Sequence, residues 1–293
     1  MYISINLMGG LGNQLFQIFV TISTALKYKL PFKFVYSDIL TIGINRPTYW
    51  NNFLKSLKIF TDNKLNINNY PTLRELNYNY HKIELDNHID IIKKNGLKLS
   101  GYFQSYKYFE ENYDYIKKLI KLDENIMNIR NKYSNYFKDN INNIINVSIH
   151  FRLGDYKDNP DYHPIMNFDY YKNSLDLIMK ENYNNNIINI LYFCEEEDNQ
   201  YVIDTFINPL KMLYIPLDNN FIKVDDNIDD WEQLLLMANC NHNIIANSSF
   251  SWWGAYFNFN QDKIVCYPAI WFGKKANINT KDLCPDNWIK VES

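Results

Sequence analysis

Several features that define common protein classes are absent from this sequence. Its four cysteines, Cys194, Cys240, Cys266 and Cys284, are scattered and form no C-x-x-C pair. The sequence therefore predicts buried free thiols in a reducing compartment and no structural zinc site. No apolar run reaches the ~18 residues that a membrane-spanning helix needs. The first residues, "MYISINLM", lack the basic region and long apolar run of a signal peptide. We therefore expect a soluble, cytoplasmic protein with no membrane span.

An excess of positive charge is also missing. The formal net charge is -3 and the pI is about 6.0, whereas a nucleic-acid-binding domain is usually basic, with clustered lysine and arginine. Nucleic acid is therefore not an expected partner. Any phosphate must be recognised by a few placed side chains and backbone amides. The 293 residues suit one large domain or two of ordinary size, and 46% of them are hydrophobic, which is enough for a sizeable core.

The sequence also lacks the Asp-x-Asp pair with which many nucleotide-sugar transferases hold a divalent ion. No two aspartates stand two residues apart, and the nearest cluster, Asp225 to Asp230, begins a predicted helix. We therefore expect no metal and no other cofactor. Charge on a leaving group would then be stabilised by an arginine and by helix N-termini.

The second half of the chain alternates between apolar, β-branched runs and amphipathic segments. Strands are predicted at 144–151, 187–194, 211–217, 242–247 and 263–268, and helices at 168–183, 226–240 and 248–258. Continuous apolar strands are typical of a parallel sheet that is covered on both faces. The alternation predicts a doubly wound α/β domain.

The first half begins in the same way and then becomes irregular and aromatic. Strands are predicted at 2–8, 31–36 and 96–103, with a long helix at 11–29. A helical segment that runs into an Asn-rich linker places the domain boundary near residue 140. We expect two Rossmann-type α/β domains, 1–140 and 141–293, that face each other across a ligand cleft at their strand ends.

Polar motifs follow the predicted strands of the second half. "HFRLGDY" contains His150, Arg152 and Asp155, and the planar guanidinium of Arg152 suits a pyrophosphate. Asp155 could orient Arg152, cap its own loop or act as a base. The alternative is a surface turn, because Gly-Asp is common turn chemistry.

Two further motifs follow the next strands. In "NSSFSWWG", Ser248 and Ser249 stand at a helix N-terminus and could bind an anion or simply cap the helix. Trp252 and Trp253 are expected to pack in the core. In "CEEED", an acid such as Glu195 could contact a ribose or base, but acids that begin a helix are routine.

The opening motif "GGLGNQ" fails both common nucleotide-binding patterns. Gly10-x-Gly12 is present, but Leu15 stands where a dinucleotide loop has its last small residue, and no Gly-Lys-Ser/Thr follows. Asn13 and Gln14 at a helix start could still place amides near a ligand. The alternative is tight strand-to-helix packing without a ligand.

Four motifs, "MGGLGNQLFQ", "SGYFQSYKYF", "HFRLGDY" and "NIIANSSFSWWGAYF", occur in the order found in glycosyltransferase family 11, the α-1,2-fucosyltransferases, and the resemblance runs from Met8 to about Phe272. It implies a GT-B-like fold, GDP-fucose as donor, no metal, and inverting transfer of L-fucose to the 2-hydroxyl of a galactose-containing acceptor. Domain 1–140 would bind the acceptor and domain 141–293 the GDP-sugar. Because Golgi relatives carry a membrane anchor, the chain resembles the soluble bacterial members.

The resemblance also implies roles for particular residues. Arg152 resembles the arginine that binds the donor pyrophosphate, and Asp155 and Asn13 join it as candidate catalytic residues. The candidate donor-binding residues are Gly10, Gly12, Asn13, His150, Arg152, Glu195, Asn247, Ser248, Ser249 and Phe250. Two departures concern Leu153, where many members have a second arginine, and 194–197, where many have a Ser-Asp-Asp-like stretch.

Three other functions are compatible with parts of the sequence. A transferase of the same fold could use a different donor hexose with the same phosphate-binding residues. A Rossmann oxidoreductase would need the glycine spacing that is broken at Leu15. A non-catalytic carbohydrate-binding protein would use the many tyrosines and tryptophans to stack on sugars.

Overall fold

The chain divides into two units. The computed structural model describes residues 1–137, 143–182, 187–214 and 220–292. The N-terminal unit comprises Met1–Asn125 and Ile278–Pro285, and the C-terminal unit comprises Ile126–Asn277 and Asp286–Ser293. The boundary expected near residue 140 lies outside the described residues. The division falls instead inside helix α4 (Leu122–Lys132), and the return of 278–285 to the first unit gave no signal in the sequence.

A six-stranded parallel sheet forms the centre of the C-terminal unit. Its strands lie in the order β10-β9-β8-β11-β12-β13, and every neighbouring pair is parallel. Their bounds are β8 Ile144–His150, β9 Ile187–Phe193, β10 Phe221–Lys223, β11 His242–Ile244, β12 Val265–Pro268 and β13 Ile289–Val291. The order corresponds to 3-2-1-4-5-6 of the dinucleotide-binding fold, which places the topological switch point between β8 and β11.

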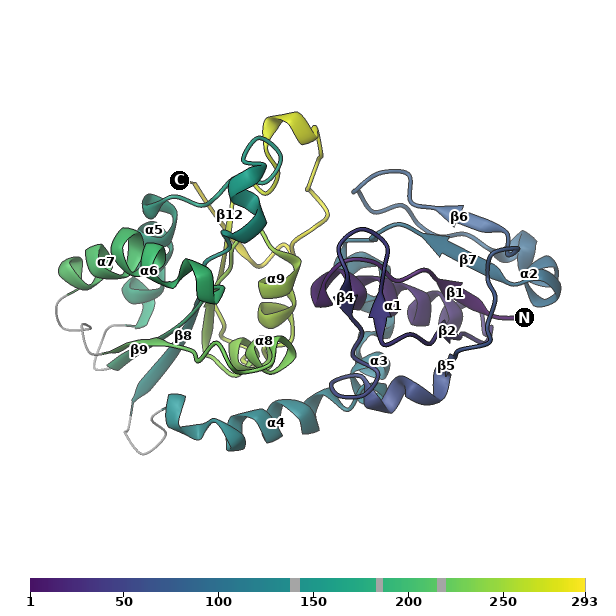
Figure 1. Ribbon diagram of the computed structural model, residues 1–293, viewed down its shortest axis with the longest axis horizontal. Coiled ribbons are helices and arrows are strands. Elements are labelled where there is room, and N and C mark those ends of the chain that lie inside the picture. Colours follow the sequence, from purple (N-terminus) through teal and green to yellow (C-terminus); the bar gives the residue numbers. More distant parts are fainter. Residues whose placement is uncertain (138–142, 183–186, 215–219, 293) are drawn as a thin grey trace. The chain divides into compact units, whose positions relative to one another are not determined.

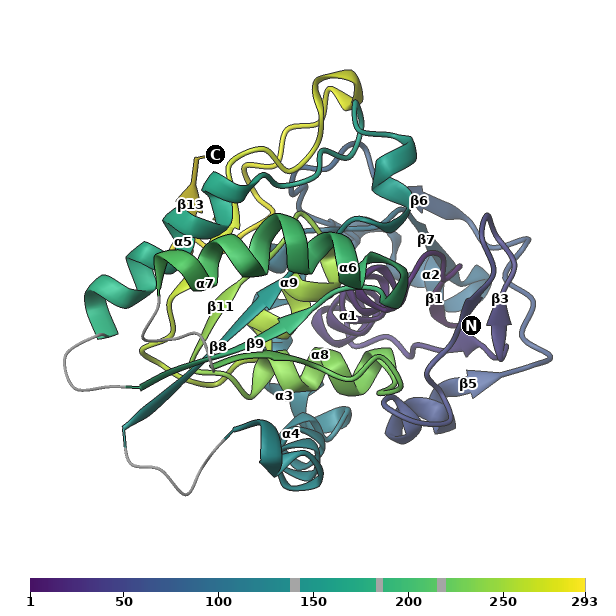
Figure 2. The same ribbon diagram turned by 60° about the vertical axis from the view of Figure 1, so that its left-hand side comes forward.

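Helices cover both faces of this sheet, as the continuous apolar strands predict (Figure 1). On one face lie α5 (Phe168–Asn182), α6 (Asn199–Val202) and α7 (Asn208–Leu213), and on the other lie α8 (Asp230–Ala238) and α9 (Ser249–Tyr256). Strands β8, β9 and β11 run side by side between them (Figure 2). The α/β class is therefore confirmed.

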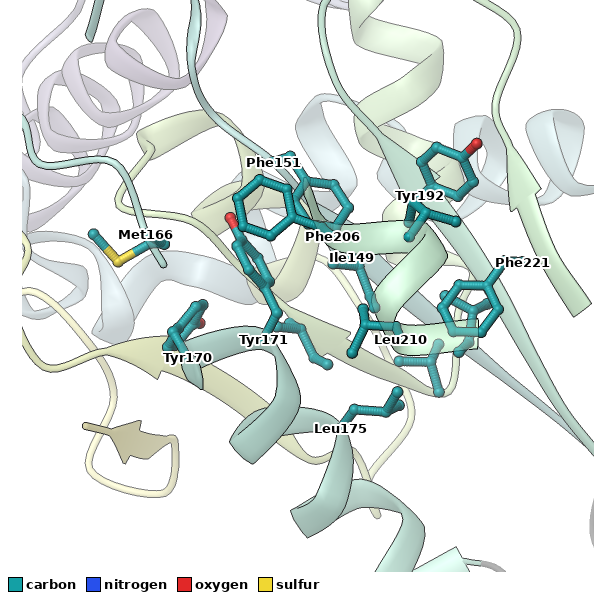
Figure 3. Close-up of a cluster of buried hydrophobic side chains, with 14 of the residues drawn as sticks. Ile149, Phe151, Met166, Tyr170, Tyr171, Leu175, Tyr192, Phe206, Leu210 and Phe221 are labelled. Atoms are coloured by element: carbon teal, nitrogen blue, oxygen red, sulfur yellow. The ribbon is translucent and has the colours of Figure 1, made fainter. Parts of the chain in front are cut away.

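The alternation of side chains along β8 assigns one set to each face. Val147 and Ile149 are fully buried in the cluster formed with α5, α6 and α7, where the rings of Phe151, Tyr171 and Phe206 meet (Figure 3). Ser148 points to the other face and accepts a hydrogen bond from Asn243 Nδ2 at 2.7 Å. Successive side chains of a strand point to opposite faces of the sheet. Because Val147 and Ile149 pack on one face, His150 lies on the opposite face together with Ser148.

Most of the predicted elements of this unit are present, with one correction. The apolar run 211–217 is not a strand over its first part, because Lys211–Leu213 close helix α7; residues 215–217 lie outside the described residues. Short apolar runs do not distinguish a strand from a helix end. The edge strand β10 and the last strand β13, three residues each, were not predicted.

The N-terminal unit is built from shorter elements. Its main sheet has the parallel order β1-β7-β6, beside a parallel pair β2-β5 and an antiparallel pair β3-β4. The strand bounds are β1 Ile3–Ile5, β2 Phe34–Val35, β3 Ile39–Leu40, β4 Arg46–Pro47, β5 Thr61–Asp62, β6 Thr72–Arg74 and β7 Leu97–Ser100. The helices are α1 Leu11–Lys27, α2 Ile89–Asn95 and α3 Tyr113–Leu119.

Helix α1 is the core element of the N-terminal unit. Leu15, Phe16, Ile18 and Phe19 are fully buried, and Phe19 makes an edge contact with Phe109 at a centroid distance of 5.2 Å. A helix that is apolar on nearly every side must be buried, which explains why it contacts β1 on one side and α3 on another.

All four cysteines are free and buried, as the sequence predicts. Within the part of the chain that the structure describes, no helix combines the length and apolar character that crossing a membrane requires.

Candidate functional site

The motifs of the second half of the chain meet at the switch point of the C-terminal sheet. "HFRLGDY" begins at the end of β8 and "NSSFSWWG" follows β11, and these two strands are neighbours with Ile149 opposite Ile244. "CEEED" follows β9, the other neighbour of β8. In open α/β sheets, ligands bind outside the strand carboxyl ends at this point.

Arg152 lies between two carboxylates and above an aromatic ring. Its guanidinium donates to Glu195 and to Asp155 and lies 5.0 Å from the Tyr156 ring centroid. Burial by itself would lower the pKa of Arg152. The carboxylates of Glu195 and Asp155 have the larger combined effect, so the pKa of the guanidinium is raised. Arg152 is therefore held as a permanent, oriented cation, and the ion pair favours an orienting role for Asp155.

The acids after β9 hold the loop after β8. Gly154, at φ +40°, donates its amide to Asp198 Oδ2 at 2.9 Å, and Lys157 pairs with the other oxygen of Asp198. A Cβ on Gly154 would lie 2.6 Å from Glu195 Oε2. Glu195 thus lies against Arg152 and the loop, and its contact with a donor stays a prediction.

The same acids form a compact group. Carboxylate oxygens of Glu195, Glu197 and Asp198 lie within 4.8 Å of one another, which is close enough for a shared cation. Arg152, Lys157 and the Gly154 amide already account for the placement of Glu195 and Asp198. The absence of a metal requirement stays a prediction.

Ser248 caps helix α9, which is one of the two roles that the sequence left open. Its hydroxyl accepts a hydrogen bond from the Phe250 amide at 3.3 Å. Trp252 and Trp253 are fully buried, so their predicted packing role is confirmed. Leu153 is also buried in the apolar cluster of this unit, 2% exposed, so this leucine contributes packing at the position where many members of the resembled family have a second arginine.

His150, the last residue of β8, packs against the start of the same helix. Its ring centroid is 5.6 Å from that of Phe250. Burial, and then the nearby charge of Arg152, lower the pKa of His150 to about 3, so it is neutral at physiological pH. Among the described residues, His150 Nδ1 is one of the buried polar atoms without a hydrogen-bond partner, and such atoms are candidates for contact with water or ligand.

Asn247 links the helix start to two loops. Its Nδ2 donates to the carbonyls of Pro164 and Trp271 at 2.9 and 3.0 Å, and its carbonyl accepts from the Tyr156 hydroxyl at 3.0 Å. Its buried Oδ1 has no partner among the described residues. Asn247 thus fixes the loops and leaves one acceptor at the strand end.

Sequence reasoning missed Tyr156 and His163. The two rings stack with their centroids 4.7 Å apart and an interplanar angle of 23°. The Tyr156 ring also contacts the Arg152 guanidinium. Burial lowers the pKa of His163. Tyr156 stands inside the recognised motif and could have been identified there, whereas the loop of His163 carries no spacing signal.

The opening motif belongs to the N-terminal unit and is held by amide side chains. Gly9 is at φ +79°, and Gly10 precedes helix α1, where a Cβ would meet open space. Gln14 donates to the carbonyls of Gly9 and Pro47. Asn13, on the first turn of α1 with Gly12, accepts from Gln104 at 2.7 Å. A glycine is therefore required at position 9 for structural reasons, whereas the space beside the Gly10 backbone is open.

These features define an α/β protein with a dinucleotide-type sheet, whose switch point gathers an oriented arginine and a capped helix N-terminus. The chain belongs to glycosyl transferase family 11, because the model of that family matches residues 2–292. It is therefore a glycosyltransferase by family.

Two relatives come from Escherichia coli. The O-antigen biosynthesis glycosyltransferase WbnK is 31% identical over 215 residues, which cover 71% of this chain and 65% of that protein, less than two thirds of its length. An α-1,2-colitosyltransferase is 28% identical over 303 residues, which cover 98% of this chain and 97% of the relative. A solved structure of a mutant Arabidopsis thaliana FUT1 in complex with GDP shares 10% identity at a TM-score of 0.49, covering 91% of this chain and 70% of that one.

Proposed function

We propose that this glycosyltransferase transfers L-fucose from GDP-fucose to the 2-hydroxyl of a galactoside, with inversion at the anomeric carbon. The observation that carries the proposal is the position of Arg152. It stands at the switch point of a dinucleotide-type sheet, two residues beyond the end of β8, and the neighbouring strand β11 leads into helix α9. A diphosphate bound at this point would meet both a guanidinium and helix amides.

In this mechanism the acceptor 2-hydroxyl oxygen attacks C1 of fucose from the face opposite GDP. The new C1–O bond forms while the bond from C1 to the β-phosphate oxygen breaks, through an oxocarbenium-like transition state. GDP leaves with the bonding electron pair. Arg152 and the first amides of α9 stabilise the charge that develops on the diphosphate.

The proton of the acceptor hydroxyl has two possible destinations. Asp155 is exposed, but its carboxylate is already paired with Arg152, which supports transfer of the proton to the leaving diphosphate. The variant Asp155→Asn separates the two. If Asp155 orients Arg152, the donor KM rises and kcat changes little; if Asp155 is the base, kcat falls and its pH dependence changes.

The donor is tested first by binding. Isothermal titration with GDP, GDP-fucose, GDP-mannose and UDP-sugars should give the tightest binding for GDP and GDP-fucose, and Arg152→Ala should weaken both. Tight UDP-sugar binding without GDP binding would contradict the proposed donor. Glycan binding without nucleotide binding would identify a carbohydrate-binding protein, and binding of NADH would revive the oxidoreductase alternative.

The acceptor is tested on a glycan array with GDP-fucose, followed by linkage analysis of the product. The expected product carries fucose α-1,2-linked to galactose. A product with another linkage would contradict the proposed acceptor hydroxyl. Activity that survives EDTA would support metal independence, and loss that is restored by Mg²⁺ or Mn²⁺ would contradict it.

A second candidate is the transfer of colitose. The relative named α-1,2-colitosyltransferase aligns with nearly the whole chain, and the same phosphate-binding residues would serve a colitosyl donor. Direct competition between GDP-fucose and the corresponding GDP-linked colitose, with kcat/KM measured for each, decides between the two sugars.

A further inference from the structure

Three neighbouring strands of the N-terminal sheet end side by side, and each is followed by a segment that carries polar groups. Ile5 of β1 lies opposite Leu99 of β7, and Arg74 of β6 lies opposite Ser100 (Figure 1). Because parallel strands end at the same sheet edge, the glycine turn before α1, Glu75 and the turn 101–104 are gathered there. Sequence reasoning assigned a role only to the first.

The turn after β7 has a strained backbone. Gly101 is at φ +150° and Phe103 is at φ +53° although it is not a glycine. Phe103 is 1% exposed and packs edge-on against Tyr108 at 5.2 Å. A non-glycine residue in the left-handed region persists only where its surroundings enforce it, and such residues cluster at functional sites.

Glu75 is the group that enforces this turn. Its two carboxylate oxygens accept from the Tyr102 and Phe103 amides at 2.7 and 2.9 Å, and its own amide donates to Ser100 O at 2.8 Å. Glycine is required at 101, because a Cβ there would lie 2.4 Å from the Glu75 side chain. Burial raises the pKa of Glu75, and the two amides partly offset this.

The turn places the Gln104 side chain within hydrogen-bonding distance of Asn13. Gln104 is 7% exposed, and its Nε2 donates to Asn13 Oδ1 at 2.7 Å. With Oδ1 of Asn13 as the acceptor in this bond, its Nδ2 lies on the side of Gly9, where a Cβ would be 2.5 Å from it. Gln17 ties the two segments together, since it accepts from Met8 N at 3.0 Å and donates to Gly101 O at 3.3 Å.

We propose that Glu75 and Gln104 are positioning residues for the candidate catalytic residue Asn13: Glu75 holds the strained turn, and Gln104 fixes the orientation of the Asn13 amide. The role of Asn13 is the one implied by the resemblance to glycosyltransferase family 11, so this inference rests on the proposed function. It goes beyond that function by assigning two residues that act on the reaction only through a third.

The first test is a double-mutant cycle in the full chain. Gln104→Met keeps the length of the side chain and removes the donor, so kcat should fall at least tenfold while the donor Kd changes less than twofold. Asn13→Ala should lower kcat strongly while it changes the free energy of unfolding only slightly. Adding Gln104→Met to Asn13→Ala should cause no further loss, because Gln104 acts only through Asn13. Gln200→Met, which removes an exposed glutamine paired with Asp204 at 2.9 Å, is the matched control.

The second test uses no substrate. Glu75→Gln replaces one carboxylate oxygen by an amide that cannot accept, so hydrogen exchange at Tyr102 and Phe103 should accelerate at least tenfold, and the Asn13 side-chain amide NMR signal should shift. Gln104→Met should shift the same signal without accelerating that exchange. Glu84→Gln, at an exposed glutamate of the same unit, should do neither.

Three results would overturn the proposal: a double mutant that loses the product of the two single effects, an Asn13 signal unmoved by Gln104→Met, or one unmoved by Glu75→Gln. If Glu75→Gln does not fold, Gln104→Met still decides the Gln104–Asn13 step. If the wild-type chain transfers no sugar from any donor, the proposed function fails, and the NMR and exchange results still judge the positioning of Asn13.

Discussion

The two units build their strand-end motifs by different means. In the C-terminal unit, two seven-residue strands and a complete parallel order bring "HFRLGDY" and "NSSFSWWG" together, and ion pairs then hold the side chains. In the N-terminal unit the main strands are three or four residues long, and a buried amide and a half-buried carboxylate hold the turns through backbone hydrogen bonds. Strand topology gathers both sets, but local polar contacts carry more of the placement in the N-terminal unit.

This difference has a consequence for mutations. A residue held by topology can be changed with loss of its own contact only, because the strands remain where they are. A residue held by neighbouring side chains shifts when any of them is changed, since a buried amide that loses its partner is costly and the turn rearranges. We therefore expect local effects in the C-terminal unit and coupled effects in the N-terminal unit.

The largest expected effect is that of Arg152→Ala. Removal of a cation that meets developing charge on the diphosphate should lower kcat by about 10²–10³-fold, or roughly 2.7–4 kcal/mol of transition-state stabilisation. Steady-state kinetics with GDP-fucose measures it. Lys172→Ala, which removes an exposed lysine paired with Asp176 at 2.8 Å in the same unit, is the control. Normal turnover by Arg152→Ala would remove Arg152 from the site.

Acid should destabilise the C-terminal unit through His150. The pKa of His150 is about 3 in the folded chain against 6.5 for an ordinary histidine, because it is buried beside Arg152. Between these two pH values the unfolded chain binds a proton at His150 that the folded chain does not bind. The contribution of His150 to the unfolding free energy is therefore fully present above pH 6.5 and decreases as the pH falls toward 3. The slope from this residue is at most about 1.4 kcal/mol per pH unit.

Urea unfolding of the wild type and His150→Gln between pH 7 and 4 measures this slope. The variant should show a shallower decline in unfolding free energy. His88→Gln, at an exposed histidine of the other unit, is the control. Equal slopes for the wild type and His150→Gln would contradict a buried, neutral His150.

Matched glycine substitutions compare the two units directly. Gly154 and Gly9 both have positive φ, and a Cβ would displace Glu195 in one case and Asn13 in the other. Each alanine should cost about 1–2 kcal/mol in backbone strain. Gly154→Ala should mainly raise the donor KM, and Gly9→Ala should mainly lower kcat; the same kinetic pattern in both variants would argue against the difference between the units.

The smallest expected effect is the loss of a helix cap. Ser248→Ala removes the bond from the Phe250 amide and should lower the unfolding free energy by about 1 kcal/mol. Ser105→Ala in the N-terminal unit loses a cap and also the 2.6 Å bond to Asp282 O, so it should cost more. Denaturant unfolding compares them, and a larger loss from Ser248→Ala would contradict the idea that contacts are more coupled in the N-terminal unit.

Much of the C-terminal unit could be predicted because its signals are local. Strands β8, β9, β11 and β12 are apolar, β-branched runs, and the residues that follow them are polar, so the strand-end motifs are visible from one stretch of chain at a time. The edge strands β10 and β13 were missed because three residues carry too little periodicity.

The sequence by itself determined the α/β class, the family motifs, and the buried cysteines and tryptophans, since each depends on neighbouring residues or on composition. Only the tertiary structure decided the strand order that creates the switch point, the pairing of Arg152 with Glu195, the stacking of His163 on Tyr156, and the hold of Glu75 and Gln104 on the turn beside Asn13. These contacts join residues from 7 to 91 positions apart, and no local pattern records which distant groups will meet when the chain packs.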